Sequence, residues 1–201
     1  MPKAYEPNDR LARRAQHQGY RARSVYKLQE IDQKFHLFKP GQIILDVGAY
    51  PGSWLQYVAI QIGPTGKVVG VDIQPIEPVA PNVTLLTEDI NNTSQLIEQF
   101  NNLTIQQFDL IISDIAPSTT GIPGVDQAKS VELSRMVIKV AEQFLKDKGT
   151  VVMKVFQGEA LVVFLKQLKQ QFGYVTVYKA KSSRDRSREV YVICQRKKNR
   201  E

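Results

Sequence analysis

Residues 42–54, QIILDVGAYPGSW, decide the fold of this chain. Residues 42–49 are mostly aliphatic and end in a glycine-containing turn, which is typical of a buried strand. Gly48 and Gly52 allow close backbone approach in this turn, and an apolar pattern with helical spacing follows over residues 53–62. A strand that leads through such a turn into a helix is the first half of a βαβ unit.

The same alternation continues along the chain. Further strands are predicted at residues 67–73, 82–90, 108–116, 150–156, 174–180 and 188–195, and helices at 19–36, 94–102, 125–146 and 160–172. Strands separated by helical patterns indicate an α/β, Rossmann-like fold: a mostly parallel, seven-stranded sheet with helices on both faces. Residues 181–187, KSSRDRS, are too few for a crossover helix, so the C-terminal strand should be antiparallel.

Length and composition bound the class of protein. The chain has 201 residues, 42% of them hydrophobic, which fits one globular domain over residues 1–201 with a flexible basic arm at 1–18. No apolar run approaches the roughly 20 residues of a membrane span, and no secretory signal is evident. The single cysteine, Cys194, excludes a disulfide framework. We therefore expect a cytoplasmic protein with no membrane partner.

Positive charge is concentrated at the two ends of the sequence. The net charge is +7, with nine Lys/Arg and four Asp/Glu in residues 1–39 and nine Lys/Arg and three Asp/Glu in residues 179–201. The middle of the chain is therefore acidic overall. Basic ends predict a phosphate-binding surface for RNA, for which Arg13, Arg14, Arg21, Arg23 and the cluster at 184–188 are candidates.

Acidic side chains follow the strands near which a cofactor should bind, because ligands of open α/β sheets lie beyond the carboxyl ends of the strands. The turn reads D-x-G-x-x-P-G over residues 46–52, which fits S-adenosylmethionine better than a dinucleotide. Asp72 ends the second strand and can accept hydrogen bonds from ribose hydroxyls. Asp89 follows the third strand and can reach an adenine amino group. Trp54 is either a wall of this pocket or an ordinary core residue.

Four charged residues occupy comparable joints at the ends of predicted elements. Lys154 ends the apolar run GTVVMKVFQG (149–158), where a lysine is costly unless it faces a cleft. Lys27, Asp114 and Glu189 lie at similar positions elsewhere in the chain. Taken singly, Lys27 could be a surface lysine and Glu189 a cross-strand partner. Together the four predict one active site assembled by folding.

Several segments of the chain resemble the FtsJ/RrmJ family of S-adenosylmethionine-dependent ribose 2′-O-methyltransferases, which act on RNA. The resemblance extends from about residue 19 to residue 194. Its segments are GYRARSVYKLQEID (19–32), LDVGAYPGSW (45–54), VGVDI (69–73), SDIAPSTTGIPGVDQ (113–127), MKVFQG (153–158) and RDRSREVY (184–191). Tyr50 and Ser53 depart from the family's usual AAPGGW turn, and Ser118 stands where an asparagine is usual.

The resemblance implies a class I methyltransferase fold and assigns site residues. The family's catalytic Lys–Asp–Lys–Glu tetrad falls on Lys27, Asp114, Lys154 and Glu189. Its S-adenosylmethionine contacts fall on the following residues: Gly52, Trp54, Asp72, Asp89 and Asp114.

The implied reaction is transfer of a methyl group to a ribose 2′-hydroxyl of RNA. The predicted substrate is a uridine in large-subunit ribosomal RNA, and a transfer RNA or a non-catalytic RNA-binding role are the alternatives. Lys154 would either take the hydroxyl proton or stabilise a developing alkoxide. Neither histidine, His17 or His36, follows a predicted strand, so no metal is expected. The enzyme is expected to be a monomer.

Overall fold

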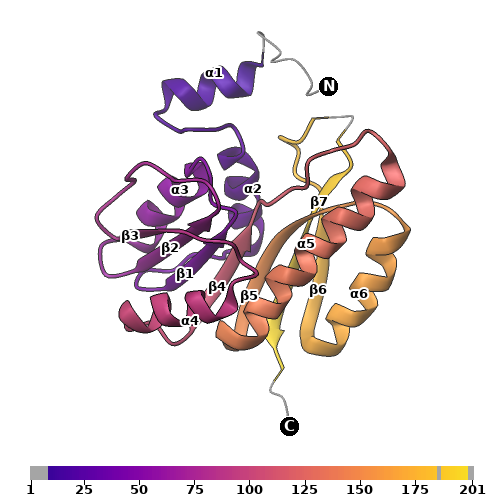
Figure 1. The fold of residues 1–201 in the computed structure, drawn as a ribbon. Coiled ribbons are helices and arrows are strands. Elements are labelled where there is room, and N and C mark those ends of the chain that lie inside the picture. The colour runs from indigo at the N-terminus through magenta and orange to yellow at the C-terminus, as the bar shows by residue number, and fades with distance from the viewer. Residues whose placement is uncertain (1–8, 185–186, 199–201) are drawn as a thin grey trace.

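The seven strands form one sheet in the order β3-β2-β1-β4-β5-β7-β6 (Figure 1). The computed structural model of the protein describes residues 9–184 and 187–198. The strands are β1 (Ile43–Val47), β2 (Lys67–Asp72), β3 (Val83–Thr87), β4 (Phe108–Ser113), β5 (Leu145–Phe156), β6 (Phe172–Tyr178) and β7 (Glu189–Lys197). The predicted Rossmann-like α/β fold with seven strands is confirmed.

β7 is the antiparallel strand of this sheet. The pairs among β1 to β5 are parallel, whereas β7 is antiparallel to both of its neighbours, β5 and β6. The register places Tyr191 opposite Lys154 and Glu189 opposite Phe156. The prediction drawn from the short connection at 181–187 is therefore confirmed. Insertion of β7 also brings the start of this late strand beside the end of β5.

Helices cover both faces of the sheet and enclose two hydrophobic cores (Figure 1). One face carries α2 (Val25–Phe35) and α3 (Ser53–Ile62), with α1 (Arg10–His17) above them beyond the carboxyl ends of the strands. The other face carries α4 (Thr93–Asn102), α5 (Pro123–Phe144) and α6 (Glu159–Gln171). Leu28 and Leu55 are fully buried on the first face and Phe164 on the second. Each such side chain contributes about 2 kcal/mol through burial. Within the described residues, no helix is long and apolar enough to cross a membrane.

Several boundaries differ from those expected. The helix predicted at 19–36 begins at Val25, and the strand predicted at 150–156 begins at Leu145. Residues 10–17 of the expected flexible arm form helix α1, because Asp9 caps it by accepting from Leu11 N and Ala12 N and because Ala15 is buried. Residues 1–8 lie outside the described residues, so the flexibility of the arm stays a prediction. The helix expected to end at 146 ends at Phe144, since β5 begins at once and pairs with β4 through a register shift.

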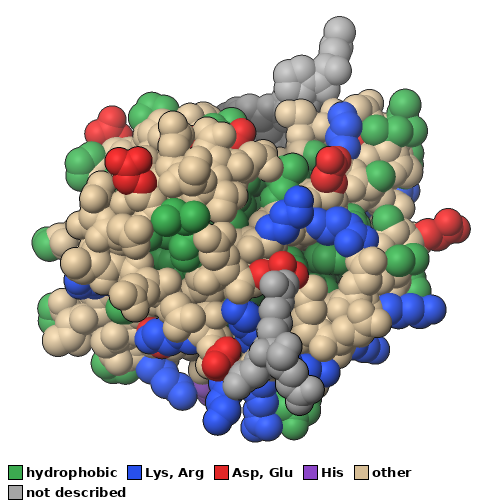
Figure 2. All heavy atoms as spheres, turned by 60° about the horizontal axis from the view of Figure 1, so that its bottom comes forward, with side chains coloured by type: hydrophobic (Ala, Val, Ile, Leu, Met, Phe, Trp, Pro, Cys, Tyr) green, Lys and Arg blue, Asp and Glu red, His purple; other side chains and the backbone are tan. Residues whose placement is uncertain are grey.

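The amino-terminal edge of the sheet carries exposed cations, and Figure 2 shows Lys and Arg side chains gathered on this side of the molecule. Lys197 Nζ donates to the carbonyl oxygens of Ala141, Glu142 and Leu145 at 3.0, 2.9 and 2.7 Å, around the end of α5. Cations at a helix C-terminus offset its negative partial charge. The basic segment 179–201 is therefore divided, because β7 carries its second half away from the other end of the sheet.

Candidate active site

The turn after β1 forms one side of a cleft at the carboxyl ends of the strands. Gly48 has φ +73°, and a Cβ there would come within 2.8 Å of Ile115 Cβ. Gly52 has φ +102° and begins α3, and a Cβ there would meet the Arg21 guanidinium at 2.8 Å. Both positions therefore need glycine, because a side chain would be strained and would also collide with its neighbour. The resulting turn leaves backbone close to the cleft.

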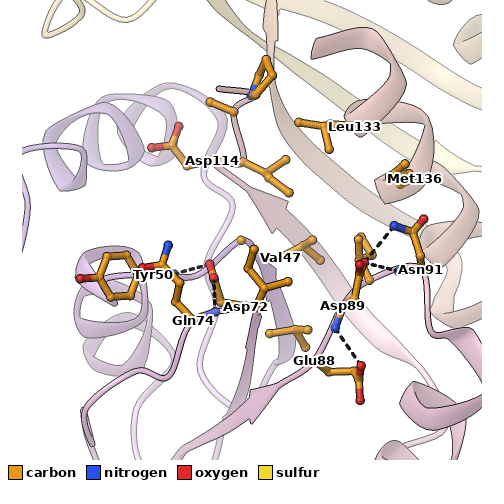
Figure 3. Close-up of a pocket in the computed structure, with 17 residues that line it drawn as sticks. Val47, Tyr50, Asp72, Gln74, Glu88, Asp89, Asn91, Asp114, Leu133 and Met136 are labelled. Carbon is orange, nitrogen blue, oxygen red and sulfur yellow. Dashed lines mark hydrogen bonds between the residues drawn. The ribbon is translucent and has the colours of Figure 1, made fainter. Parts of the chain in front are cut away.

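Three of the predicted carboxylates line this cleft, which has a volume of about 430 Å³ (Figure 3). Asp72 Oδ2 accepts a hydrogen bond from Tyr50 N and Oδ1 accepts one from Gln74 N, both at 2.9 Å. Asp89 Oδ1 accepts from the backbone and side-chain amides of Asn91 at 2.9 Å. These bonds fix both carboxylates on the wall, and each carboxylate can still accept a hydrogen bond from a ligand. Asp114 is the third.

Asp46, at the end of β1, was not predicted as a site residue. It is 1% exposed, and its Oδ2 has no hydrogen-bond partner within the described residues. Burial raises the pKa of this carboxyl well above its ordinary value, and the charges of Asp114 and Asp72 raise it further. A concentration of carboxyl groups at adjacent strand ends suits a cofactor that carries positive charge, as S-adenosylmethionine does through its sulfonium and ammonium groups.

Two of the predicted cofactor residues do not line the cleft. Gly52 is the last residue of the turn, and its positive φ allows the chain to enter α3. Trp54 is 3% exposed, donates from Nε1 to Ser24 O at 3.0 Å and packs against Tyr191 with ring centroids 5.9 Å apart. Its indole thus fills the core between α2, α3 and the sheet. Direct contact of Gly52 or Trp54 with the cofactor stays a prediction.

The four predicted catalytic residues come together as two ion pairs. Lys154 Nζ lies 3.0 Å from Asp114 Oδ1 and 2.5 Å from the Asp114 carbonyl oxygen. Lys27 Nζ lies 2.5 Å from Glu189 Oε1. All four side chains are less than a fifth exposed. The residues come from α2, the end of β4, β5 and the start of β7, so distant parts of the chain form one polar cluster.

The charge state of Glu189 links the two pairs. Burial alone would raise the pKa of this carboxyl, but the charge of Lys27 and its hydrogen bond lower it. The charge of Lys154 adds to this, and the net result is a pKa below the ordinary value. Glu189 is therefore ionised at neutral pH and holds Lys27 in place through their ion pair. The positive charge of Lys154 also stabilises the ionised form of Glu189.

Tyr191 is a site residue that was missed. Its hydroxyl donates to Asp114 Oδ1 at 2.7 Å, and the side chain is fully buried. Burial raises the pKa of this phenol well above its ordinary value, as do the charges of Asp114 and Glu189, so it remains a donor. Asp114 is thus fixed from two sides. Residues two apart on a strand share a face, so the position of Tyr191 relative to Glu189 was the available signal.

Two arginines expected to bind phosphate make hydrogen bonds within the protein. Arg21 Nη1 donates to Pro51 O and Glu77 O at 3.1 and 2.8 Å, and Nη2 donates to Pro78 O at 2.7 Å. Its guanidinium therefore joins the cofactor turn to the loop after β2, and backbone carbonyls accept three of its five N–H donors. Arg23 donates to Asp9 and to Ser182 O.

The arrangement defines the class of protein. A doubly covered sheet of this strand order, a cleft for a cationic nucleoside cofactor and an adjoining lysine–carboxylate cluster make a Rossmann-like methyltransferase. Within residues 9–184 and 187–198, no group of three or more His, Cys, Asp and Glu could hold a metal ion.

Comparison with known proteins identifies the family. The FtsJ-like methyltransferase family matches residues 20–197. A protein named ribosomal RNA large subunit methyltransferase E from Azoarcus sp. is 42% identical over 92% of this chain and 90% of its own length. Its namesake from Bdellovibrio bacteriovorus is 39% identical over 94% and 96%. The chain therefore belongs to the FtsJ-like methyltransferase family, which confirms the predicted enzyme class and its cofactor, S-adenosylmethionine.

Solved structures agree with this assignment. A Plasmodium falciparum protein described as a ribosomal RNA methyltransferase is 31% identical with a TM-score of 0.81, over 90% of this chain and all of that one. Fibrillarin from Aeropyrum pernix, solved with S-adenosyl-L-methionine, has a TM-score of 0.60 at 18% identity, over 87% of this chain and 75% of its own. The second likeness concerns the fold alone.

Proposed function

We propose that this enzyme transfers a methyl group from S-adenosylmethionine to the 2′-hydroxyl of a uridine in large-subunit ribosomal RNA. One observation carries the proposal: Asp114 lines the cofactor cleft and also binds Lys154 Nζ. A methyl donor bound in the cleft would therefore lie close to this lysine. The substrate follows from relatives that are about 40% identical and are named for large-subunit ribosomal RNA.

The proposed roles of the four residues follow from their contacts. Bound S-adenosylmethionine supplies an electrophilic methyl group activated by its sulfonium charge. The protein must then align the ribose oxygen with that methyl group and handle one proton. Asp114 orients Lys154, and Tyr191 orients Asp114. The Lys27–Glu189 pair closes the other side of the cluster and positions the ribose.

The contacts of Lys154 favour a hydrogen bond to the reacting oxygen. An ammonium group has three donors, and the Asp114 carboxylate and carbonyl oxygens accept two of them. The third is available to the ribose 2′-oxygen, where it would stabilise negative charge while the hydroxyl proton passes to solvent water. Removal of the proton by the neutral amine is the alternative, and it differs in predicting that the rate rises with pH.

RNA would reach the cluster across a surface of exposed cations. Arg10, Arg13 and Arg14 are exposed on α1, and Arg184 and Arg188 are exposed on the loop before β7. Contacts of this kind position the RNA backbone without reading its sequence. The ribosomal context, the monomeric state and the cytoplasmic location stay predictions. A non-catalytic RNA-binding role is disfavoured because both ion pairs of the cluster are intact.

Methyl transfer from labelled S-adenosylmethionine tests the proposal. We expect label to enter large-subunit ribosomal RNA, supplied free or within the large subunit, and mapping should place it on one uridine ribose. Transfer RNA in a parallel reaction tests the alternative substrate. Cofactor binding without transfer to any RNA would contradict the proposal, and transfer to transfer RNA alone would move the activity to that substrate.

A further inference from the structure

We propose that Arg23 and Arg184 form a binding site for a phosphodiester of the RNA substrate, and that the carboxylate of Asp9 fills this site until RNA arrives. The inference rests on the proposed RNA substrate and deepens it, because it names a particular phosphate contact and the group that the phosphate replaces. It concerns a cluster outside the cofactor cleft and outside the two catalytic ion pairs.

Two guanidinium groups converge on one carboxylate oxygen. Arg23 Nη1 donates to Asp9 Oδ2, and Arg184 Nη2 lies 3.4 Å from the same oxygen. One negative charge therefore faces two positive charges, and the cluster keeps an excess of one positive charge. Arginine forks match the oxygens of phosphates as well as those of carboxylates. Arg184 is 56% exposed at its side chain, so an RNA strand can approach it from solvent.

The Asp9 carboxylate accepts hydrogen bonds from backbone N–H groups and from arginines, which are also the donors that bind phosphates. Its Oδ1 accepts from Leu11 N and Ala12 N at 3.1 and 3.2 Å, while Oδ2 faces the arginines. Burial opposes its ionisation, but hydrogen bonds from Arg23 and Ala12 bring the pKa of Asp9 below its ordinary value. The capping oxygen and the arginine-facing oxygen have separate partners. A phosphate can therefore replace Oδ2 between the arginines while Oδ1 still caps α1.

The two-arginine cluster is fixed beside the catalytic residues. Arg23 Nη2 donates to Ser182 O at 2.6 Å, in the loop that leads to Glu189. Glu30 accepts from Lys181 N and Ser182 N at 2.6 and 2.9 Å, which holds this loop on α2. Arg23 also lies four residues before Lys27 in the chain.

The chemistry of RNA explains why a phosphate site belongs at this place. The 2′-hydroxyl that accepts the methyl group lies on the carbon next to the one that carries the 3′-phosphodiester. A ribose held at the catalytic cluster must therefore bring a phosphate close to it. The N-terminal end of α1 and the loop before β7 meet at that end of the molecule (Figure 1). Exchange of Asp9 Oδ2 for this phosphate would occur only once substrate is in place, and the cap of α1 through Oδ1 would be kept.

The variant Asp9→Asn separates competition from structural support. Asparagine caps a helix as well as aspartate does, so α1 is kept while the negative charge facing the arginines is lost. We expect the KM for RNA to fall about fivefold, in line with the removal of one partly exposed ion pair. The KM for S-adenosylmethionine should be unchanged. The salt dependence of RNA binding should steepen by about one charge.

Matched variants complete the test. Glu98→Gln makes the same charge change at an exposed residue of α4 and should leave the KM for RNA within twofold, which controls for net charge. Arg184→Gln should raise the KM for RNA about fivefold, because it removes one arm of the phosphate site. An Asp9→Asn enzyme with an unchanged or raised KM for RNA would overturn the inference. Failure of the wild-type enzyme to methylate any RNA would instead overturn the proposed function.

Discussion

The two ends of the sheet are both rich in charge but use it in different ways. At the carboxyl ends of the strands, Lys154 and Lys27 pair with carboxylates around a cleft. At the amino ends, Lys197 donates to three backbone carbonyls, and Lys198 Nζ donates to Lys169 O at 3.0 Å near the end of α6. The first set of lysines forms ion pairs beside the cleft, and the second set binds backbone carbonyls at the ends of helices.

This difference shows what a basic segment in a sequence can mean. Residues 179–201 look uniform in composition. Of the described ones, residues 181–184 lie beside α1 and α2, whereas Lys197 and Lys198 lie at the far end of the sheet. Charge that faces helix carbonyls contributes to stability, whereas charge around the cleft is held for a ligand. Substitution of a lysine should therefore reduce activity at one end of the sheet and reduce folding stability at the other.

The largest expected effect is that of Lys154→Met. We expect methyl transfer to fall by about 10³-fold, because the group that stabilises or deprotonates the reacting oxygen is lost. Lys197→Met is the matched change at the other end, and it should keep transfer within twofold while it lowers the free energy of unfolding by about 1 kcal/mol. Single-turnover rates and urea unfolding measure the two effects. A fully active Lys154→Met enzyme would contradict the view that lysines at the two ends of the sheet have different roles.

The next effect concerns the two ends of helix α3. Gly52 and Gly63 flank this helix, and both have positive φ, at +102° and +68°. A Cβ at Gly52 would press on Arg21, whereas at Gly63 nothing lies within 4 Å. Both alanine variants should lose about 1–3 kcal/mol of stability from backbone strain. Only Gly52→Ala should also weaken S-adenosylmethionine binding, and isothermal titration calorimetry would show whether the two variants differ in this way.

The smallest effect is a pH dependence of stability from Glu189. The pKa of this carboxyl in the folded protein lies below its ordinary value of 4.5. The folded state therefore binds fewer protons than the unfolded state, and the contribution of Glu189 is present above pH 4.5 and lost as the pH falls through the folded pKa. The difference in unfolding free energy between wild type and Glu189→Gln should shrink below pH 4.5. A difference that stays constant between pH 7 and pH 3 would contradict this.

Most of the sheet could be predicted from the sequence because its strands are short aliphatic runs separated by helical patterns. Helix α1 could not, since it has few apolar residues and depends on Asp9 and on burial of Ala15 against the body. The positions of Lys27, Asp114, Lys154 and Glu189 were predicted through the family's motifs. Their pairing needed the register of β7, which only the fold supplies.

The partners of the arginines could not be predicted for a different reason. The basic segment around Arg21 predicts contact with substrate, but three of its N–H donors bind the carbonyl oxygens of Pro51, Glu77 and Pro78. The sequence contains no signal for these backbone carbonyls because they come from two separate loops. Asp46 was similarly hidden, since its meaning lies in the nearby charges of Asp72 and Asp114 rather than in its own segment.

The insertion of β7 between β5 and β6 also sets an order of events during synthesis. Translation proceeds from the N-terminus, so β1, β2 and β4, which carry the cofactor residues, are available well before β7 emerges. Within the described chain, β6 pairs with β7 alone, so it must wait for a strand made after it. A nascent chain can thus form its cofactor cleft early. Glu189 and Tyr191 join the site only when β7 pairs with β5 and β6.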